Sequence, residues 1–144
     1  MSRAKISGLS HLTLAVTDLE RSIRFYHDLL GCELRATWDG GAYLEAGPLW
    51  LCLSVDGRAK SSQRGDYTHY AFSVEASRFD ELAARIRSCT ELWKVDASEG
   101  ASLYFLDPDA HRLELHVGTL NSRLDHYRSQ PNNLVRIIED GAQD

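Results

Sequence analysis

The stretch HLTLAV at residues 11–16 is followed 58 residues later by HYAFSV at residues 69–74. In both stretches a histidine opens an alternation of apolar side chains with small or polar ones. A second pair, WLCLSV at 50–55 and RLELHV at 112–117, repeats with an offset of 62 residues. Because self-similarity at a nearly constant spacing indicates a duplicated structural unit, we predict two related modules that each begin and end with a strand.

The remaining pattern fills in each module as βαβββ. Thr17 and Asp18 are favourable N-cap residues, apolar residues at helical spacing follow them, and Gly31 is placed to end this first helix. Ser77 with Asp80 resembles a weak capping box for a second helix. We predict strands near residues 9–16, 33–38, 41–46, 49–55, 68–74, 91–95, 102–106 and 111–117. The expected fold is α+β, with two βαβββ modules forming a curved mixed sheet. A single domain spans 1–144, with repeats at about 6–56 and 66–118, a polar linker between them and a C-terminal tail at 119–144.

Composition narrows the class of protein. The chain has 144 residues, 43% of them hydrophobic, which suits one globular domain. No apolar run approaches the roughly 20 residues that span a bilayer, and the start lacks a signal peptide, so we expect a cytoplasmic protein with no membrane partner. Cys32, Cys52 and Cys89 are odd in number, which argues against a disulfide framework. A net charge of −5 without a basic stripe argues against nucleic acid and favours a small ligand.

Strand parity suggests a metal centre. Alternation puts His11 and Thr13 on the face opposite Leu12 and Leu14, and the same split places His69 and Glu114 on polar faces. Two imidazoles and one carboxylate leave coordination positions open, as a catalytic manganese, iron(II) or zinc ion requires. Cys52, equivalent in position to Glu114, could be a fourth ligand, and His116 shares the face of Glu114 without a clear role. Three further histidines are expected to be solvated: His27, His111 and His126.

Several long strings resemble a known family: LSHLTLAV (9–16), LWLCLS (49–54), DYTHYAF (66–72), SEGAS (98–102), YFLDPD (104–109) and HRLE (111–114). The chain resembles the vicinal oxygen chelate superfamily of glyoxalase I, extradiol dioxygenases and bleomycin-resistance proteins. It is most similar to the fosfomycin-resistance glutathione transferases, over about residues 4–124. The resemblance implies a potassium-stimulated manganese(II) enzyme that adds glutathione to the epoxide of fosfomycin, working as a homodimer with active sites shared between two chains.

The resemblance also implies roles for individual residues. His11, His69 and Glu114 would hold the metal. The phosphonate would be bound by Lys94, Ser98, Ser102, Tyr104 and Arg123, with Thr13 near the oxirane oxygen; Thr13, Lys94 and Arg123 would be catalytic. Tyr43 and Trp50 would line the substrate site, and Trp38, Cys52 and Ser54 are weaker candidates. The potassium loop would use Asp96, Ser98, Gly100 and Ser102. Lysine, arginine and hydroxyl donors are the groups that a phosphonate dianion requires.

The sequence departs from the family at two positions. Asp96 stands where the family often has asparagine. Ala110 stands where the family tends to have glycine, and alanine would strain the backbone if that position needs a positive φ.

The sequence also leaves competing functions open. A hydrolase would require a carboxylate base near the epoxide, for which Asp39 and Glu45 are the candidates, and a different thiol transferase could use the same scaffold. An isomerase or dioxygenase of the wider superfamily and a metal-free drug-binding module also stay open.

Overall fold

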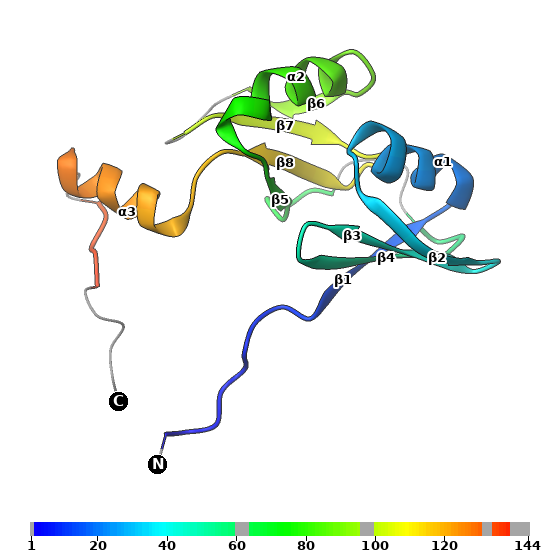
Figure 1. The fold of residues 1–144 in the computed structure, drawn as a ribbon, viewed down its shortest axis with the longest axis horizontal. Helices are drawn as coiled ribbons and strands as arrows, with labels where there is room; N and C mark the ends of the chain where they lie inside the picture. Colours follow the sequence, from blue (N-terminus) through cyan, green and yellow to red (C-terminus); the bar gives the residue numbers. More distant parts are fainter. Residues whose placement is uncertain (1, 60–63, 96–99, 131–133, 139–144) are drawn as a thin grey trace.

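Two four-stranded mixed sheets form the body of the protein in the computed structural model, which describes residues 2–59, 64–95, 100–130 and 134–138 (Figure 1). The first module contains β1 (His11–Val16), α1 (Leu19–Ile23), η1 (Arg24–Leu29), β2 (Glu33–Trp38), β3 (Gly41–Ala46) and β4 (Leu49–Val55). The second contains β5 (Tyr70–Ser73), α2 (Ala76–Arg87), β6 (Leu92–Lys94), β7 (Ser102–Leu106) and β8 (Arg112–His116), followed by α3 (Leu120–Ser129). The predicted α+β fold of two βαβββ modules is confirmed.

The two sheets have the same topology. Their strand orders are β1-β4-β3-β2 and β5-β8-β7-β6, so the first strand of each module pairs in parallel with the last. The registers correspond as well, since His11 faces Trp50 and Tyr70 faces Leu113. β1 and β5 are therefore edge strands, and each module's polar residues are carried on its own sheet.

The apolar faces of both sheets belong to one core. Leu14 and Val16 of β1 are buried, whereas His11 and Thr13, which alternate with them, are exposed. The buried apolar residues of the second sheet join the same cluster, whose strand members are Leu14, Val16, Ala42, Leu44, Leu51, Leu53, Leu103, Phe105, Leu113 and Leu115. Strand parity thus has the consequence predicted from the sequence: each sheet keeps one polar face outside the core.

The helix ends follow local chemistry in one module and not in the other. Asp18 caps α1 by accepting a hydrogen bond from the Arg21 backbone N–H at 3.1 Å, and Gly31 follows η1 with a φ of +81°, as expected. The predicted capping box at Ser77 and Asp80 is wrong. α2 begins one residue earlier, after Glu75, which makes no side-chain capping bond. Burial of Phe79, Ala83 and Ile86 against the core accounts for α2 instead.

A buried polar cluster joins the modules where the β7–β8 turn lies against the end of β1. Asp109 accepts hydrogen bonds from the Thr17 N–H at 3.1 Å and hydroxyl at 2.6 Å, and Asp107 accepts from the Tyr26 hydroxyl at 2.7 Å. Burial raises the pKa of Asp107. The expectation that His111 is solvated is wrong: its ring is buried and Nε2 donates to the Ala15 carbonyl at 2.8 Å. His111 therefore ties the second module to β1.

Ala110, in the same turn, has a φ of +62°. In this left-handed conformation a residue with a Cβ is destabilised by about 1–2 kcal/mol. Replacing it with glycine recovers only part of that free energy, because glycine has the larger conformational entropy in the unfolded state. We therefore expect Ala110→Gly to stabilise the fold by about 0.5–1 kcal/mol and to raise the melting temperature by about 2–4 °C, measured by calorimetry. The matched reverse change is Gly31→Ala, because Gly31 also has a positive φ and a Cβ there meets no atom within 4 Å. Gly31→Ala should lower the melting temperature. An unchanged or lower melting temperature for Ala110→Gly would contradict the inference that the Ala110 backbone is strained.

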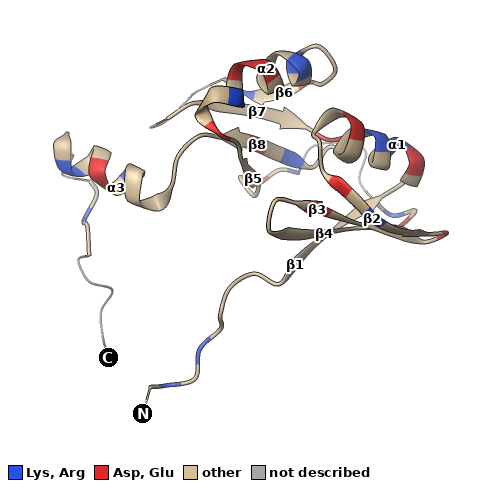
Figure 2. Cartoon of the chain, viewed as in Figure 1, with Lys and Arg blue, Asp and Glu red and all other residues tan. Residues whose placement is uncertain are grey.

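Two of the helices carry surface charge of both signs (Figure 2). Figure 2 shows acidic and basic residues interspersed along α1 and α2. α3 projects from the sheets, has no buried residue and leaves Leu120 72% exposed. Within the described ranges no helix is both long and apolar enough to cross a membrane.

Candidate active site

The polar face of the second sheet gathers many of the predicted site residues. Glu114 lies in the middle of β8, with Tyr104 of β7 as its register partner, and Ser102 faces His116 two residues further along. Lys94 ends β6, and His69 directly precedes β5. The parallel pairing of β5 with β8 brings His69 alongside Glu114, although 45 residues separate them in the sequence.

The hydrogen bonds of His69 determine which ring nitrogen carries its proton. Nδ1 lies 2.9 Å from the carbonyl oxygen of Tyr67, which can only accept, so Nδ1 is the donor. In the neutral ring, Nε2 then presents a lone pair to Oε1 of Glu114 at 3.2 Å. Two acceptors at this distance require a proton or a cation between them. Ligands bound at about 2.1 Å and at right angles lie about 3 Å apart, so this pair fits two neighbouring ligands of one metal ion.

The other oxygen of Glu114 is held from the opposite side. Oε2 accepts a hydrogen bond from the Ser102 hydroxyl at 2.9 Å and lies 3.2 Å from Nδ1 of His116. Nδ1 of His116 is also 2.7 Å from the Ser102 oxygen. Glu114 is 7% exposed, so these contacts compensate for the water that the carboxylate loses.

Lys94 lies within an aromatic cluster beside this pair. Its ammonium donates to the Tyr67 hydroxyl and lies 4.9 Å and 4.8 Å from the ring centroids of Tyr67 and Tyr104. Tyr67 also contacts the ring of His69, with centroids 4.9 Å apart. Cation–π and hydrogen-bond contacts keep the ammonium close to the His69–Glu114 pair, where an anion could meet it.

The other predicted residues lie on the first sheet. His11 and Thr13 are exposed on β1, and the ring of His11 packs on Trp50 at 4.3 Å. Trp50 contacts Tyr43 at 5.2 Å, and Tyr43 contacts Trp38 at 4.7 Å. These rings form an aromatic face of the first sheet on which Trp38 is 45% and Trp50 40% exposed. Across the part of the chain that the structure describes, no three His, Cys, Asp or Glu side chains are grouped closely enough to hold a metal ion, so His11 does not join His69 and Glu114 within one chain.

The remaining candidates are dispersed. Arg123 lies on α3, and Cys52 is buried on β4 opposite Thr13. Gly100 has a φ of +81°, and a Cβ there would lie 2.1 Å from the Val117 carbonyl oxygen, so only glycine fits. Asp96 and Ser98 lie outside the described residues.

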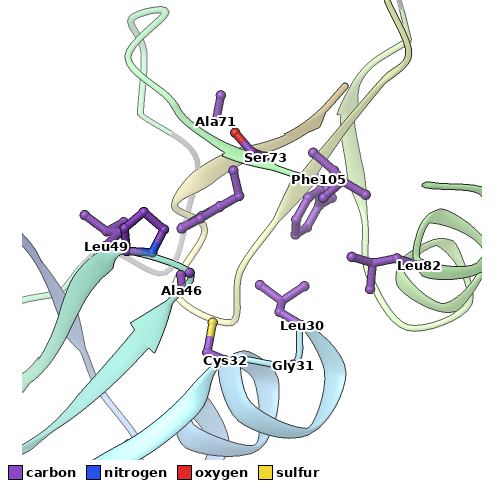
Figure 3. A pocket seen from close by; sticks show the side chains of 13 residues that line it. Leu30, Gly31, Cys32, Ala46, Leu49, Ala71, Ser73, Leu82 and Phe105 are labelled. Carbon is purple, nitrogen blue, oxygen red and sulfur yellow. The ribbon is translucent and has the colours of Figure 1, made fainter. Parts of the chain in front are cut away.

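A cavity of about 320 Å³ lies between the modules and contains none of the predicted site residues. Figure 3 shows that Leu30, Ala46, Leu82 and Phe105 line it, with the Cys32 sulfur among them. Burial raises the pKa of the Cys32 thiol to about 11, so it stays protonated and unreactive near neutral pH. This cavity therefore offers no charged partner for an anion, and its thiol is not a nucleophile near neutral pH.

Three residues of the site are not among those predicted from the sequence. Tyr67 orients His69 through its carbonyl and holds Lys94 through its hydroxyl, and Trp93 packs on His69 with centroids 5.4 Å apart. Arg112 lies over the Trp93 ring at 5.0 Å. In the sequence these aromatic and basic residues stand close to the predicted site residues His69, Lys94 and Glu114. Their contacts depend on strand pairing that the sequence does not show.

Comparison with known proteins defines the class. The model of the Glyoxalase/Bleomycin resistance protein/Dioxygenase superfamily matches residues 8–115. Glutathione transferase FosA of Serratia marcescens is 51% identical over 88% of this chain and 92% of its own length. Metallothiol transferase FosB of Lysinibacillus sphaericus is 35% identical over 87% of this chain and 92% of its own length.

A solved structure agrees with these relatives. It is a variant of the fosfomycin resistance protein FosX of Listeria monocytogenes, complexed with Mn(II) and 1S,2S-dihydroxypropylphosphonic acid. It has a TM-score of 0.75 and 34% identity, and the match covers 85% of this chain and 99% of that one. The chain therefore belongs to the Glyoxalase/Bleomycin resistance protein/Dioxygenase superfamily and, within it, to the family of fosfomycin-resistance proteins.

Proposed function

We propose that this protein is a metal-dependent transferase that adds glutathione to the epoxide of fosfomycin and thereby inactivates the antibiotic. The observation that carries this proposal is the 51% identity, over 88% of the chain, to a protein named glutathione transferase FosA. The pairing of His69 with Glu114 beside the Lys94 ammonium supports it, because an anionic phosphonate and an epoxide oxygen both need positive charge nearby.

The proposed metal is Mn(II), the ion named in the FosX complex. Bound by His69 and Glu114, with His11 as third ligand, it would supply Lewis-acid stabilisation of the oxygen that becomes an alkoxide as the ring opens. Thr13 would lie near the oxirane, and the phosphonate would be bound by Lys94, Ser98, Ser102, Tyr104 and Arg123. The thiolate sulfur forms a bond to an epoxide carbon, the C–O bond breaks, and its electron pair stays on oxygen, which then takes up a proton. The thiolate is assigned to glutathione, the cosubstrate in the name of the FosA relative.

We also propose a homodimer in which each site combines two chains. Two features support this assembly. His11 lies on a sheet separate from His69 and Glu114, and the aromatic face around it leaves Trp38 and Trp50 substantially exposed. A second copy that places its own polar sheet face against this aromatic face would cover the rings and complete a three-ligand set.

Potassium stimulation is part of the proposal as well. The candidate loop includes Asp96 and Ser98, which lie outside the described residues, together with Gly100 and Ser102. Activity measured in potassium and in sodium chloride at equal ionic strength tests it.

Epoxide hydrolysis is the second candidate function. The phosphonic acid in the FosX complex is a vicinal diol, the type of product that water addition to an epoxide gives. The carboxylate base would have to be Asp39 or Glu45. Glu45 follows Tyr43 on the same side of β3, but Arg35 donates to its carboxylate at 2.5 Å, which competes with any proton it would take from water.

Phosphorus NMR of fosfomycin separates these functions. Purified, metal-stripped protein is incubated with the antibiotic, with and without Mn(II) and glutathione. We expect a new phosphonate resonance that requires both additions, with a product mass equal to fosfomycin plus glutathione. A new resonance without glutathione would indicate the hydrolase, and no new resonance under any condition would contradict both functions.

A further inference from the structure

Trp93 is the extra residue of a bulge in β6. Leu92 pairs with Phe105 and Lys94 with Tyr104, so two steps along β6 match a single step along β7. Consecutive side chains of a regular strand point to opposite faces, whereas a bulge can aim two of them to the same side. The Trp93 ring and the Lys94 ammonium both contact the Tyr104 ring, at centroid distances of 5.3 Å and 4.8 Å. The bulge therefore brings Trp93 onto the polar face of the second sheet.

On this face the indole of Trp93 packs against the imidazole of His69. The two ring centroids lie 5.4 Å apart, and the ring planes are inclined by 57°. The pairing of β5 with β8 begins only at Tyr70, so the sheet ladder does not fix the His69 backbone. The bond from Nδ1 to the Tyr67 carbonyl fixes one ring atom, but the χ2 torsion of histidine has a broad energy well. The contact with the indole restricts rotation about this torsion.

The indole is itself anchored to β8. Its Nε1 donates a hydrogen bond to the Leu113 carbonyl at 2.9 Å, and the Arg112 guanidinium lies over the ring at 5.0 Å. Leu113 directly precedes Glu114, whose Oε1 faces Nε2 of His69 at 3.2 Å. Trp93 therefore ties the His69 ring to the strand that carries the carboxylate. A shift of the indole would change the angle between the imidazole and the carboxylate.

We propose that Trp93 is a positioning residue that fixes the plane of the His69 imidazole and thereby directs the Nε2 lone pair toward the site shared with Glu114. This inference rests on the proposed function, because it requires His69 and Glu114 to be ligands of one metal ion. The indole nitrogen is a donor only and offers a metal no lone pair, so the effect of Trp93 passes through His69. Groups that orient a histidine ligand commonly change metal affinity about 10–100-fold when removed.

Mn(II) affinity of the purified protein, measured from the EPR signal of free Mn(II), tests the proposal without any turnover. We expect Trp93→Leu, which keeps an apolar side chain but removes the ring and its N–H, to weaken Mn(II) binding about tenfold or more. Trp93→Phe retains an aromatic ring against His69 and should stay within about threefold of wild type. Each variant is measured well below its melting temperature, so that a loss of stability alone does not change the affinity. If Trp93→Leu does not fold, Trp93→Met takes its place, because methionine is a flexible apolar side chain without a ring.

The orientation of His69 can be measured separately in the metal-free protein. With isotopically labelled histidine, NMR should show the Nδ1 proton of His69 as a sharp resonance in wild type and in Trp93→Phe, because its bond to the Tyr67 carbonyl is held. In Trp93→Leu this resonance should be broadened or lost. The matched control is Tyr127→Leu on α3, which removes an aromatic ring from His126, with centroids 5.8 Å apart, and should leave both measurements unchanged.

The outcomes distinguish the role of Trp93 from the proposed function. Unchanged affinity in Trp93→Leu, beside a wild type that binds Mn(II), would overturn the role of Trp93 and leave the proposed function intact. A weaker affinity with an unchanged His69 resonance would also overturn that role, because the effect would not pass through the imidazole. A wild-type protein that binds no Mn(II) would overturn both.

Discussion

Glu114→Gln should lower the rate of glutathione addition to fosfomycin by about a thousandfold, which corresponds to ~4 kcal/mol of transition-state stabilisation. The amide has nearly the same shape as the carboxylate and can still accept from the Ser102 hydroxyl, so the local hydrogen bond and the fold should survive. The negative charge opposite Nε2 of His69 is lost, and with it the strongest attraction that this pair offers a divalent ion. Mn(II) affinity and turnover should therefore fall together.

Phosphorus NMR at saturating glutathione measures the rate, and EPR measures the affinity. The matched control is Glu91→Gln, which makes the same chemical change at an exposed position just before β6 and should leave both quantities unchanged. His69→Ala should reproduce the loss seen in Glu114→Gln. Near-normal turnover of Glu114→Gln with Mn(II) would mean that the carboxylate is not a ligand.

Much of the fold is predictable because period-2 alternation is a local property. Residues 11–16 and 112–117 show the alternation directly, and the buried apolar members of both stretches enter the core. Turn residues such as Gly31 also act locally, since a positive φ depends only on the residue's own backbone. The repeat predicts two modules of the same kind, whereas the pairing of β5 with β8, which brings His69 beside Glu114, is seen only in the structure.

The predictions that fail depend on contacts between distant segments. His111 is expected in solvent, but its partner is a β1 carbonyl 96 positions away. The predicted capping box at Ser77 and Asp80 is wrong, because α2 begins at Ala76 without a side-chain capping bond and is held instead by burial of Phe79 and Ile86. The contacts of Ser102 and His116 with Glu114 are not predictable either, because they need the register of β7 against β8. Symmetry pairs His11 with His69, yet one chain keeps them on different sheets.

Mixing two inactive variants should restore activity if each site combines two chains. In His11→Ala every site lacks one ligand, and in Glu114→Gln every site lacks another, so each protein alone should be nearly inactive. In a heterodimer, both changes fall in the same site when His11 comes from one chain and Glu114 from the other, and the second site is intact. After random exchange of equal amounts, about half of the dimers are mixed and half of their sites are intact. The mixture should therefore recover about a quarter of wild-type activity.

A second mixture provides the control, because His69 and Glu114 lie 3.2 Å apart within one chain. Combining His69→Ala with Glu114→Gln places one defect in each site of the heterodimer, so no site is intact and activity should stay at the level of the separate variants. Subunit exchange itself is checked by mass spectrometry of one isotopically labelled partner. If exchange is complete and the His11→Ala mixture remains inactive, all three ligands come from one chain. The separation of His11 from His69 and Glu114 would then have to close by movement of the two modules rather than by association of two copies.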